Sequence, residues 1–339
     1  MLKRSLVSIC SLPPELLNHV LDNEEIYTLS RCMRVCRSWY EVVVNHPVYW
    51  GDFTLQSPDA RAARGLLARI SWSHGRPVNV SISAGSNNEI PSAVILAIQQ
   101  HLYHIRDLSI DASIRQLDEV MDALERPAPL LQSLTLRFGI VVGWKPLCSS
   151  LSRHLLSGNA PKLQHLAIFN IRIPPRPMEC LAQVTELFYG TSHVMLLHEV
   201  MDDVPLGFPN LQRLTLRGRV ACTPVRSQFS SSAPIAAWWS NLRLLTLQNH
   251  YTAAIHPVFL RPTFVQLEMD DLTAALRLLS TFMGSGTLDV RAGQDFVEII
   301  DITQQRKIRF VSDDEIVTAA LFLSAFKKSR HARRANFVG

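Results

Sequence analysis

The chain has 339 residues, of which 47% are apolar and 19% are charged. A chain of this length and composition can bury a large core, which excludes wholesale disorder and suggests two domains or a small domain with a repeat array. Five of its 34 basic residues lie at 327–339, where no carboxylate occurs, and they account for the net charge of +5. The rest of the chain is neutral, so the composition does not predict a nucleic-acid-binding surface.

The six cysteines are dispersed and include no CxxC pair. This pattern is typical of free thiols in a reducing compartment rather than of a disulfide framework or a zinc ribbon. The apolar N-terminal stretch is broken by serines, and no stretch approaches the roughly 20 apolar residues of a membrane span. We expect a cytoplasmic or nuclear protein, or one found in both places, with no membrane partner.

Residues 12–53 have the spacing of short amphipathic helices. Pro13-Pro14 precedes the first helix, a favourable place for proline, and the apolar residues that follow recur at helical intervals: Leu16, Leu17, Val20 and Leu21. A second helix is expected at about 24–33 and a third at about 36–45, which contains Trp39 and ends before Pro47. The sequence predicts a three-helix module within residues 1–55. At this size it would gain stability from a partner or from the following domain.

From about residue 60 onward, short strands alternate with amphipathic helices. A template of apolar-x-x-apolar-x-apolar recurs seven times between residues 105 and 269, with four closely similar copies: LLQSLTL, KLQHLAI, NLQRLTL and NLRLLTL. Successive copies are 21–32 residues apart. Because one such unit cannot cover its own apolar face, neighbouring units must stack on it. We therefore expect residues 56–311 to form an irregular leucine-rich-repeat (β/α) solenoid, which places the chain in the α/β class.

Apolar residues at helical spacing predict helices between the strands, among them residues 117–124 and 194–201. Near the end of the chain, Ser312-Asp-Asp-Glu315 has the form of a capping box before an apolar run. We expect residues 312–339 to form a C-terminal capping helix that closes the array, followed by a basic tail. The tail could be a nuclear-import signal, a contact for anionic surfaces or a solvated disordered segment.

The template also indicates which side chains face away from the core. Residues between its apolar positions lie on the opposite face of each strand, where repeat proteins often bind their ligands. The candidate target-binding residues are Thr135, Arg137, Phe169, Thr215, Arg217, Thr246 and Gln248. An ordinary solvated strand face is the alternative for each of them. Trp238-Trp239 could anchor a partner, but we expect the pair to pack in the core.

Catalytic and metal-binding patterns are weak. Cys32 and Cys36 are four residues apart, with His19 and His46 nearby in sequence, but a zinc site needs four converging ligands. We therefore expect small buried thiols, and neither a metal nor another cofactor. The chain has no GxGxxG, GxxxxGK[ST], HExxH or GxSxG motif, so we expect no enzymatic activity. A β/α enzyme with catalytic groups at its strand ends stays an alternative.

Residues 12–50 resemble an F-box. The matching elements are, in order, Leu12-Pro13, Glu15-Leu16-Leu17, Val20-Leu21, Leu29, Val35-Cys36-Arg37-Ser38-Trp39, Pro47 and Trp50. The ordered set across these 39 residues carries the resemblance, and it departs from the family pattern at Asp22-Asn23-Glu24, which replaces a second Leu-Pro. The remainder of the chain resembles the leucine-rich-repeat bodies of F-box proteins, particularly fungal ones.

This resemblance implies a non-catalytic substrate receptor of a Skp–cullin–F-box ubiquitin ligase. The F-box would bind the Skp adaptor, and through it a cullin, while the body would recruit an unidentified target protein for ubiquitylation. The positions that the family implies as adaptor-facing or module-core are Leu12, Pro13, Leu16, Leu17, Val20, Leu21, Val35, Cys36 and Trp39. Two alternatives stay open: a repeat scaffold that acts outside a ubiquitin ligase, and a helical cap without a docking role.

Overall fold

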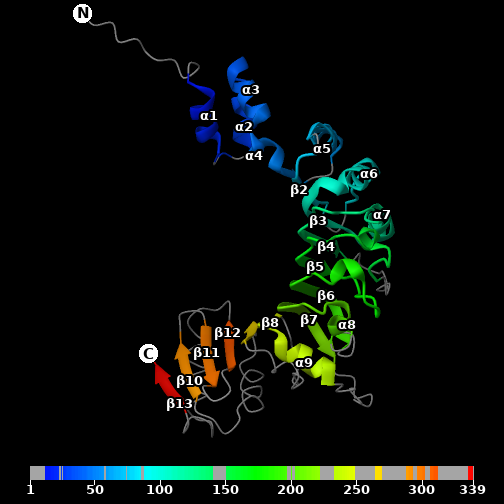
Figure 1. The fold of residues 1–339 in the computed structure, drawn as a ribbon, viewed down its shortest axis with the longest axis vertical. Helices are drawn as coiled ribbons and strands as arrows, with labels where there is room; N and C mark the ends of the chain where they lie inside the picture. Colours follow the sequence, from blue (N-terminus) through cyan, green and yellow to red (C-terminus); the bar gives the residue numbers. More distant parts are fainter. Residues whose placement is uncertain are drawn as a thin grey trace, which may run out of the picture.

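The computed structural model shows an α/β protein whose elements follow one another along an arc (Figure 1). Four short helices lie at the N-terminal end, and strands of a single sheet, with their connecting helices, make up the rest of the described chain. None of the described helices is long and apolar enough to cross a membrane. The residues that the structure describes are 12–22, 24, 26–56, 59–73, 75–84, 88–139, 150–196, 200, 203–221, 233–248, 264–268, 288–292, 296–301, 306–311 and 335–338.

The N-terminal helices are α1 (Pro14–Leu21), α2 (Ile26–Cys32), α3 (Arg37–Asn45) and α4 (Pro47–Gly51). They share a small apolar core, separate from that of the sheet, whose buried members are Leu17, Leu21, Leu29, Trp39, Val42 and Val43. The prediction of a three-helix module is wrong, because Pro47 begins a fourth helix where we expected the helical segment to end. Proline suits the first position of a helix, since the N–H that it lacks would have no intrahelical partner there.

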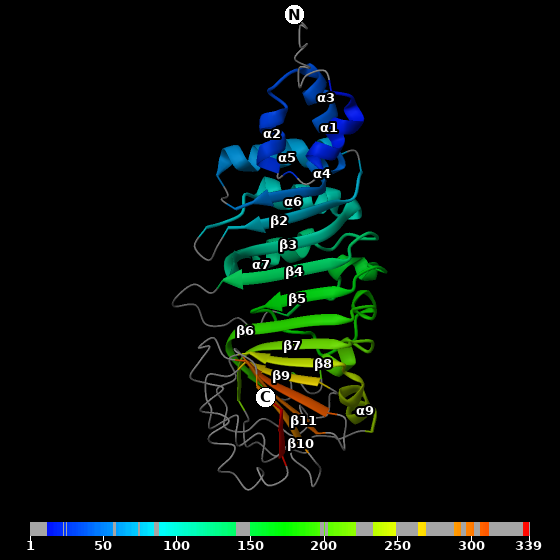
Figure 2. The ribbon, with the colours of Figure 1, turned by 90° about the vertical axis from the view of Figure 1, so that its left-hand side faces the viewer.

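Nine parallel strands then follow in chain order across the sheet. They are β1 (Asp52–Leu55), β2 (Val78–Ser83), β3 (Ile105–Ser113), β4 (Ser133–Gly139), β5 (His165–Phe169), β6 (Glu186–Leu196), β7 (Arg213–Ala221), β8 (Leu244–Gln248) and β9 (Phe264–Glu268). Each strand pairs with the next, and Figure 2 shows the face of the sheet that lies opposite the connecting helices. The seven copies of the template correspond one by one to β3–β9.

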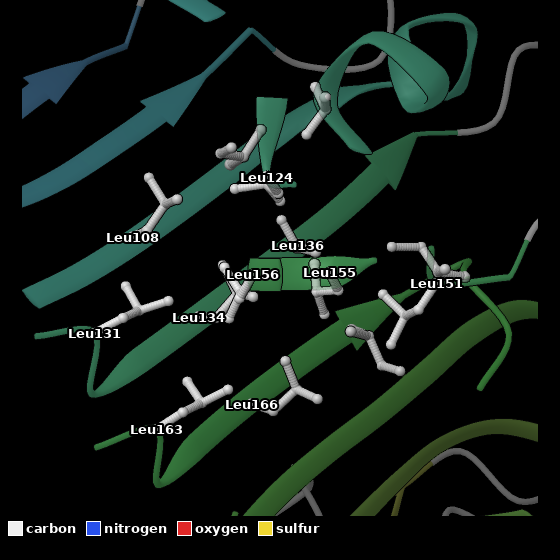
Figure 3. Close-up of a cluster of buried hydrophobic side chains, with 14 of the residues drawn as sticks. Leu108, Leu124, Leu131, Leu134, Leu136, Leu151, Leu155, Leu156, Leu163 and Leu166 are labelled. Carbon is white, nitrogen blue, oxygen red and sulfur yellow. The ribbon is translucent and has the colours of Figure 1, made fainter. Parts of the chain in front are cut away.

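The leucines of the template build the core on one side of the sheet (Figure 3). In β4, Leu134 and Leu136 are fully buried, while Thr135 and Arg137 alternate with them on the opposite face. Leucines of the connecting segments, such as Leu124, pack against this buried row. Because burial of a leucine stabilises a fold by about 1.5–3 kcal/mol, the stacked row is a major source of stability.

The connections between strands change along the sheet. The first three contain helices α5 (Ala60–Trp72), α6 (Ser92–His101) and α7 (Leu117–Ala123), with the 3-10 turns η2 (Leu102–His104) and η3 (Ile114–Gln116). The next connections contain η4 (Leu155–Gly158), η5 (Glu179–Leu181), the four-residue α8 (Val204–Gly207) and then α9 (Ala233–Asn241). The helix predicted at 117–124 is confirmed as α7. The structure does not bear out the prediction of a leucine-rich-repeat solenoid, because the described connections do not repeat one helical unit.

The helix predicted at 194–201 is wrong at its start, because residues 194–196 belong to β6, which continues to Leu196. This extension pairs with the end of β7, and Asn170, which directly follows β5, bonds to the segment just before it. Its backbone has a φ of 64°, and its side-chain Nδ2 donates a hydrogen bond of 2.6 Å to the Phe138 carbonyl oxygen. Its Oδ1 accepts a hydrogen bond of 2.8 Å from the backbone N–H of Ser192. This side chain therefore ties three successive strands together beyond the point where the template ends.

Beyond β9 the sheet is no longer purely parallel, which also contradicts the predicted solenoid. Its remaining strands are β10 (Leu288–Ala292), β11 (Phe296–Asp301), β12 (Arg306–Val311) and β13 (Ala335–Val338). β12 pairs with β9 in parallel, β11 lies antiparallel between β10 and β12, and β13 pairs with β10. The run predicted as a capping helix, residues 312–326, lies outside the described residues. The predicted basic tail ends in β13.

Arg69 of α5 joins the N-terminal helices to the sheet. Its guanidinium carbon lies 4.4 Å from the ring centroid of Phe53 in β1 and 5.1 Å from that of Tyr49 in α4. Its Nη2 donates a hydrogen bond of 2.6 Å to the Tyr49 carbonyl oxygen. Burial lowers the pKa of Arg69, but a guanidinium stays charged in proteins. These contacts hold α4 against the first strand.

Candidate protein-docking surfaces

The N-terminal helices expose apolar side chains that a folded module ordinarily buries. Leu16 and Val20 on α1, Val35 just before α3, and Tyr40 on α3 are between 44% and 53% exposed. These four, named here the exposed apolar set, are half of the eight large apolar side chains exposed in the described part of the chain. Their concentration within residues 16–40 makes this module a candidate docking surface.

Neighbouring residues of α1 have opposite environments. Leu17 and Leu21 are fully buried in the module core, whereas Leu16 and Val20, one position earlier, face solvent. This follows from helix geometry, because a step of one residue turns the side chain by about 100°. The structure thus separates positions that the sequence pattern groups together.

The other family-implied positions divide in the same way. Trp39 is buried in the core of the module, and Leu12 and Cys36 are partly buried and pack against that core. Pro13 is exposed at the start of α1, and Val35 belongs to the exposed apolar set. Sequence reasoning missed Tyr40, although its position directly after the buried Trp39 on an amphipathic helix was a usable signal.

Asp22, where the chain departs from the family pattern, has a structural role at the end of α1. Its Oδ1 lies 3.2 Å from Nε2 of His46, which is almost completely buried, and its Oδ2 lies 3.3 Å from Nδ1 of His19. His46 follows α3 directly, so the carboxylate connects the ends of α1 and α3. This connection holds in place the helices that carry the exposed apolar set.

Cys32 and Cys36, the described cysteines of the module, are free thiols. Burial, followed by the nearby charge of Glu24, raises the pKa of Cys32, so this thiol is protonated near neutral pH. No group of three or more histidine, cysteine or acidic side chains that could hold a metal ion occurs among the described residues. Cys32 and Cys36 are partly buried residues that pack against the module core.

The strand face carries most of the candidate target-binding residues in accessible positions. Arg137 and Arg217 are exposed. Four more are partly exposed, namely Thr135, Phe169, Thr215 and Gln248. Thr246 is only 6% exposed, so it presents no accessible side chain on this face. Parallel register brings Thr135 and Thr215 into one row across the sheet, and Arg137, Phe169 and Arg217 into the next.

Two residues of β6 complete this face, and sequence reasoning did not single them out. Phe188 lies in the row of the threonines and Gly190 in the row of the arginines. A Cβ added at Gly190 would lie 2.9 Å from Cε2 of Phe169 and 3.0 Å from Cε1 of Phe188. Both rings therefore rest on the space that the glycine leaves. The alternation rule that gave the other candidates, applied to the β6 sequence, would have found both residues.

The tryptophan pair has a structural role, and the thiol at one further cavity has low reactivity. Trp239 is fully buried, and Nε1 of Trp238 donates a hydrogen bond of 2.8 Å to the Phe208 carbonyl oxygen, so the expectation that this pair packs in the core is confirmed. A cavity of about 580 Å³ near η4 and η5 is lined by residues that include Arg153 and Cys180. Burial raises the pKa of Cys180 to about 11, so its thiol is a weak nucleophile near neutral pH.

Comparison with known proteins agrees with the geometry of the N-terminal helices. A family model described as F-box-like matches residues 9–56, the segment that contains α1–α4 and β1. No curated protein matches the chain. The family match ends before α5, so it gives no support to leucine-rich repeats in the sheet. Residues 9–56 of this chain are an F-box-like domain.

Proposed function

We propose that this chain is a non-catalytic receptor subunit of a Skp–cullin–F-box ubiquitin ligase in the cytoplasm, the nucleus or both. The F-box-like domain binds the Skp adaptor and through it the cullin. The sheet recruits a target protein, whose effective concentration near the ubiquitin-charged enzyme rises as a result. The observation that carries the proposal is the exposed apolar set on the helices that match the F-box-like model.

The chemistry of this surface fits a protein partner rather than a small molecule. The exposed apolar set consists of three aliphatic side chains and one tyrosine. Each of them is about half exposed, whereas the residues of the module core are buried. An amphipathic helix whose second apolar stripe faces solvent gains stability when another protein covers it. Full burial of a half-exposed leucine contributes about 1 kcal/mol, so four such side chains provide a useful part of a binding energy.

The test compares two leucines with the same exposure. Leu16 is 51% exposed on α1 and Leu96 is 52% exposed on α6, outside the F-box-like domain. Binding of purified Skp adaptor to immobilised full-length chain is measured for wild type, Leu16→Asp and Leu96→Asp. A carboxylate buried in the contact costs several kcal/mol, so Leu16→Asp weakens binding at least ~100-fold.

The control variant defines the result. Leu96→Asp leaves adaptor binding unchanged, and both variants keep the thermal unfolding temperature of wild type, because each changed side chain is half in solvent. Equal binding by wild type and Leu16→Asp overturns the docking role of α1. Failure of wild type to bind the adaptor at all overturns the proposed function.

A further inference from the structure

The strand face has an aromatic centre between two arginines. In the register of the sheet, Arg137 of β4 lies beside Phe169 of β5, then Gly190 of β6, then Arg217 of β7. Phe188 of β6 lies two positions before Gly190, on the same face. We name these five residues the aromatic–arginine patch. They belong to four consecutive strands, β4–β7, and these strands line the inner side of the arc (Figures 1 and 2).

The two rings are held in the patch by the absence of a side chain at Gly190. A Cβ at this position would approach the Phe169 ring too closely, so alanine does not fit there unless the ring moves. Both phenylalanines stay partly exposed although the opposite side of the same strands is a closed core. A partly exposed pair of rings on a rigid sheet is a preorganised anchor site for an apolar side chain.

The arginines give the patch its charge preference. Both side chains are exposed, and neither forms an ion pair with another described residue. Arg217 has Gly190 and Gln248 as its neighbours across the strands, so no carboxylate competes for it in the adjacent positions. Arginine binds carboxylates through paired hydrogen bonds, which adds specificity to the attraction of charge.

The spacing of the patch defines the length of its ligand. Neighbouring strands are about 4.8 Å apart, so Arg137 and Arg217, three strands apart, are separated by roughly 14 Å. An extended peptide advances about 3.3 Å per residue, so two acidic residues four positions apart match this distance. The residue midway between them then lies over the two rings.

We infer that the aromatic–arginine patch binds an extended protein segment with two acidic residues at i and i+4 and an apolar residue at i+2. This inference rests on the proposed function, because it gives the chemistry of the target that the sheet recruits. Single-stranded nucleic acid fits less well. Asp111 lies beside Arg137 in the same row, and Asp107 and Glu186 lie on the same face. A phosphate backbone carries a negative charge at every nucleotide and would meet these carboxylates along its length, whereas the proposed segment carries its two charges only at the arginines.

The test uses a fluorescein-labelled nine-residue peptide of glycine and serine with glutamate at positions three and seven and leucine at position five. Binding to full-length chain is followed by fluorescence polarisation. Saturable binding is expected, and Arg217→Glu or Phe169→Ala weakens it at least tenfold. Arg64→Glu on α5, an exposed arginine outside the patch, leaves it unchanged. A peptide with lysine in place of both glutamates binds the Arg137→Glu, Arg217→Glu double variant better than wild type, which a purely structural role would not produce.

Several outcomes overturn the inference. These are the absence of saturable binding by the acidic peptide, equal binding by Arg217→Glu, and tighter binding of labelled oligothymidine than of the peptide. A dimer in sedimentation that Arg217→Glu dissociates would assign the face to a second copy of the chain instead. Adaptor binding is measured on the same preparations. If the adaptor binds and the peptide does not, only this inference fails; if the adaptor does not bind, the proposed function fails.

Discussion

The neighbouring leucines of α1 give a sharp prediction about stability. Leu17 is fully buried in the small core of the F-box-like domain, so Leu17→Ala removes about 2–5 kcal/mol of stability through lost burial and the cavity that it leaves. A module of about 40 residues has only a few kcal/mol of its own, so it opens far more often in this variant. Hydrogen exchange measured by mass spectrometry on the free full-length chain detects this opening. Protection of amides in α1 and α3 is expected to fall at least ~25-fold.

The matched variant is Leu16→Ala. Leu16 is half exposed, so its truncation costs less than about 1 kcal/mol and reduces protection in α1 and α3 less than about fivefold. Amides of β3 and β4 serve as the internal reference, because their core is separate from that of the module. Equal loss of protection in the two variants would refute the division of α1 into a buried and a solvent-facing side.

Three further predictions concern the sheet and its junction with the helices. Burial and the neighbouring His104, whose Nε2 lies 3.1 Å from Nδ1 of His101, lower the pKa of His101. Stability that is present above the ordinary pKa of 6.5 is therefore lost as the pH falls through the lower folded pKa. The urea midpoint of unfolding should fall more from pH 7.5 to pH 5.5 in wild type than in His101→Gln, and equal falls would contradict this. Arg69→Lys, which loses the planar stacking on two rings, should lower the thermal midpoint by the equivalent of about 1 kcal/mol or more, whereas the same change at the exposed Arg64 should have little effect. Asn170→Ala loses hydrogen bonds and strains a backbone with positive φ, so it should destabilise the chain by about 1–3 kcal/mol in urea unfolding. Asn170→Gly removes only the hydrogen bonds and should destabilise the chain less. A larger loss of stability in Asn170→Gly than in Asn170→Ala would exclude the strain.

The parts of the fold that the sequence predicted are those with a local signal. The strand template identifies β3–β9 because its last two apolar residues stand at alternate positions of each strand, a pattern of period two. The helix α7 likewise has its apolar residues at helical spacing. By contrast, β12 pairs with β9 and β13 pairs with β10, both out of chain order, and such nonlocal pairing leaves no repeated pattern to recognise.

The errors have physical causes of the same kind. Pro47 predicts the end of a helix, although proline is equally suited to begin one, and only the tertiary structure distinguishes the two. The predicted repeat failed because the strand pattern says little about the connections, which range from a 13-residue helix to three-residue turns. In the candidate docking surfaces, residue types were predictable but exposure was not. Leu16 and Leu17 are residues of the same type, and they differ only in the side of α1 on which their side chains lie.

The central claim is that another protein covers the exposed side of α1 and the start of α3. Hydrogen-exchange footprinting of the full-length chain with and without purified Skp adaptor tests it most directly. The account predicts that the adaptor increases protection within residues 14–21 and 35–45 and leaves the amides of β3–β8 unchanged. Stable complex formation with protection confined to the sheet, or no change in protection at saturating adaptor, would contradict it.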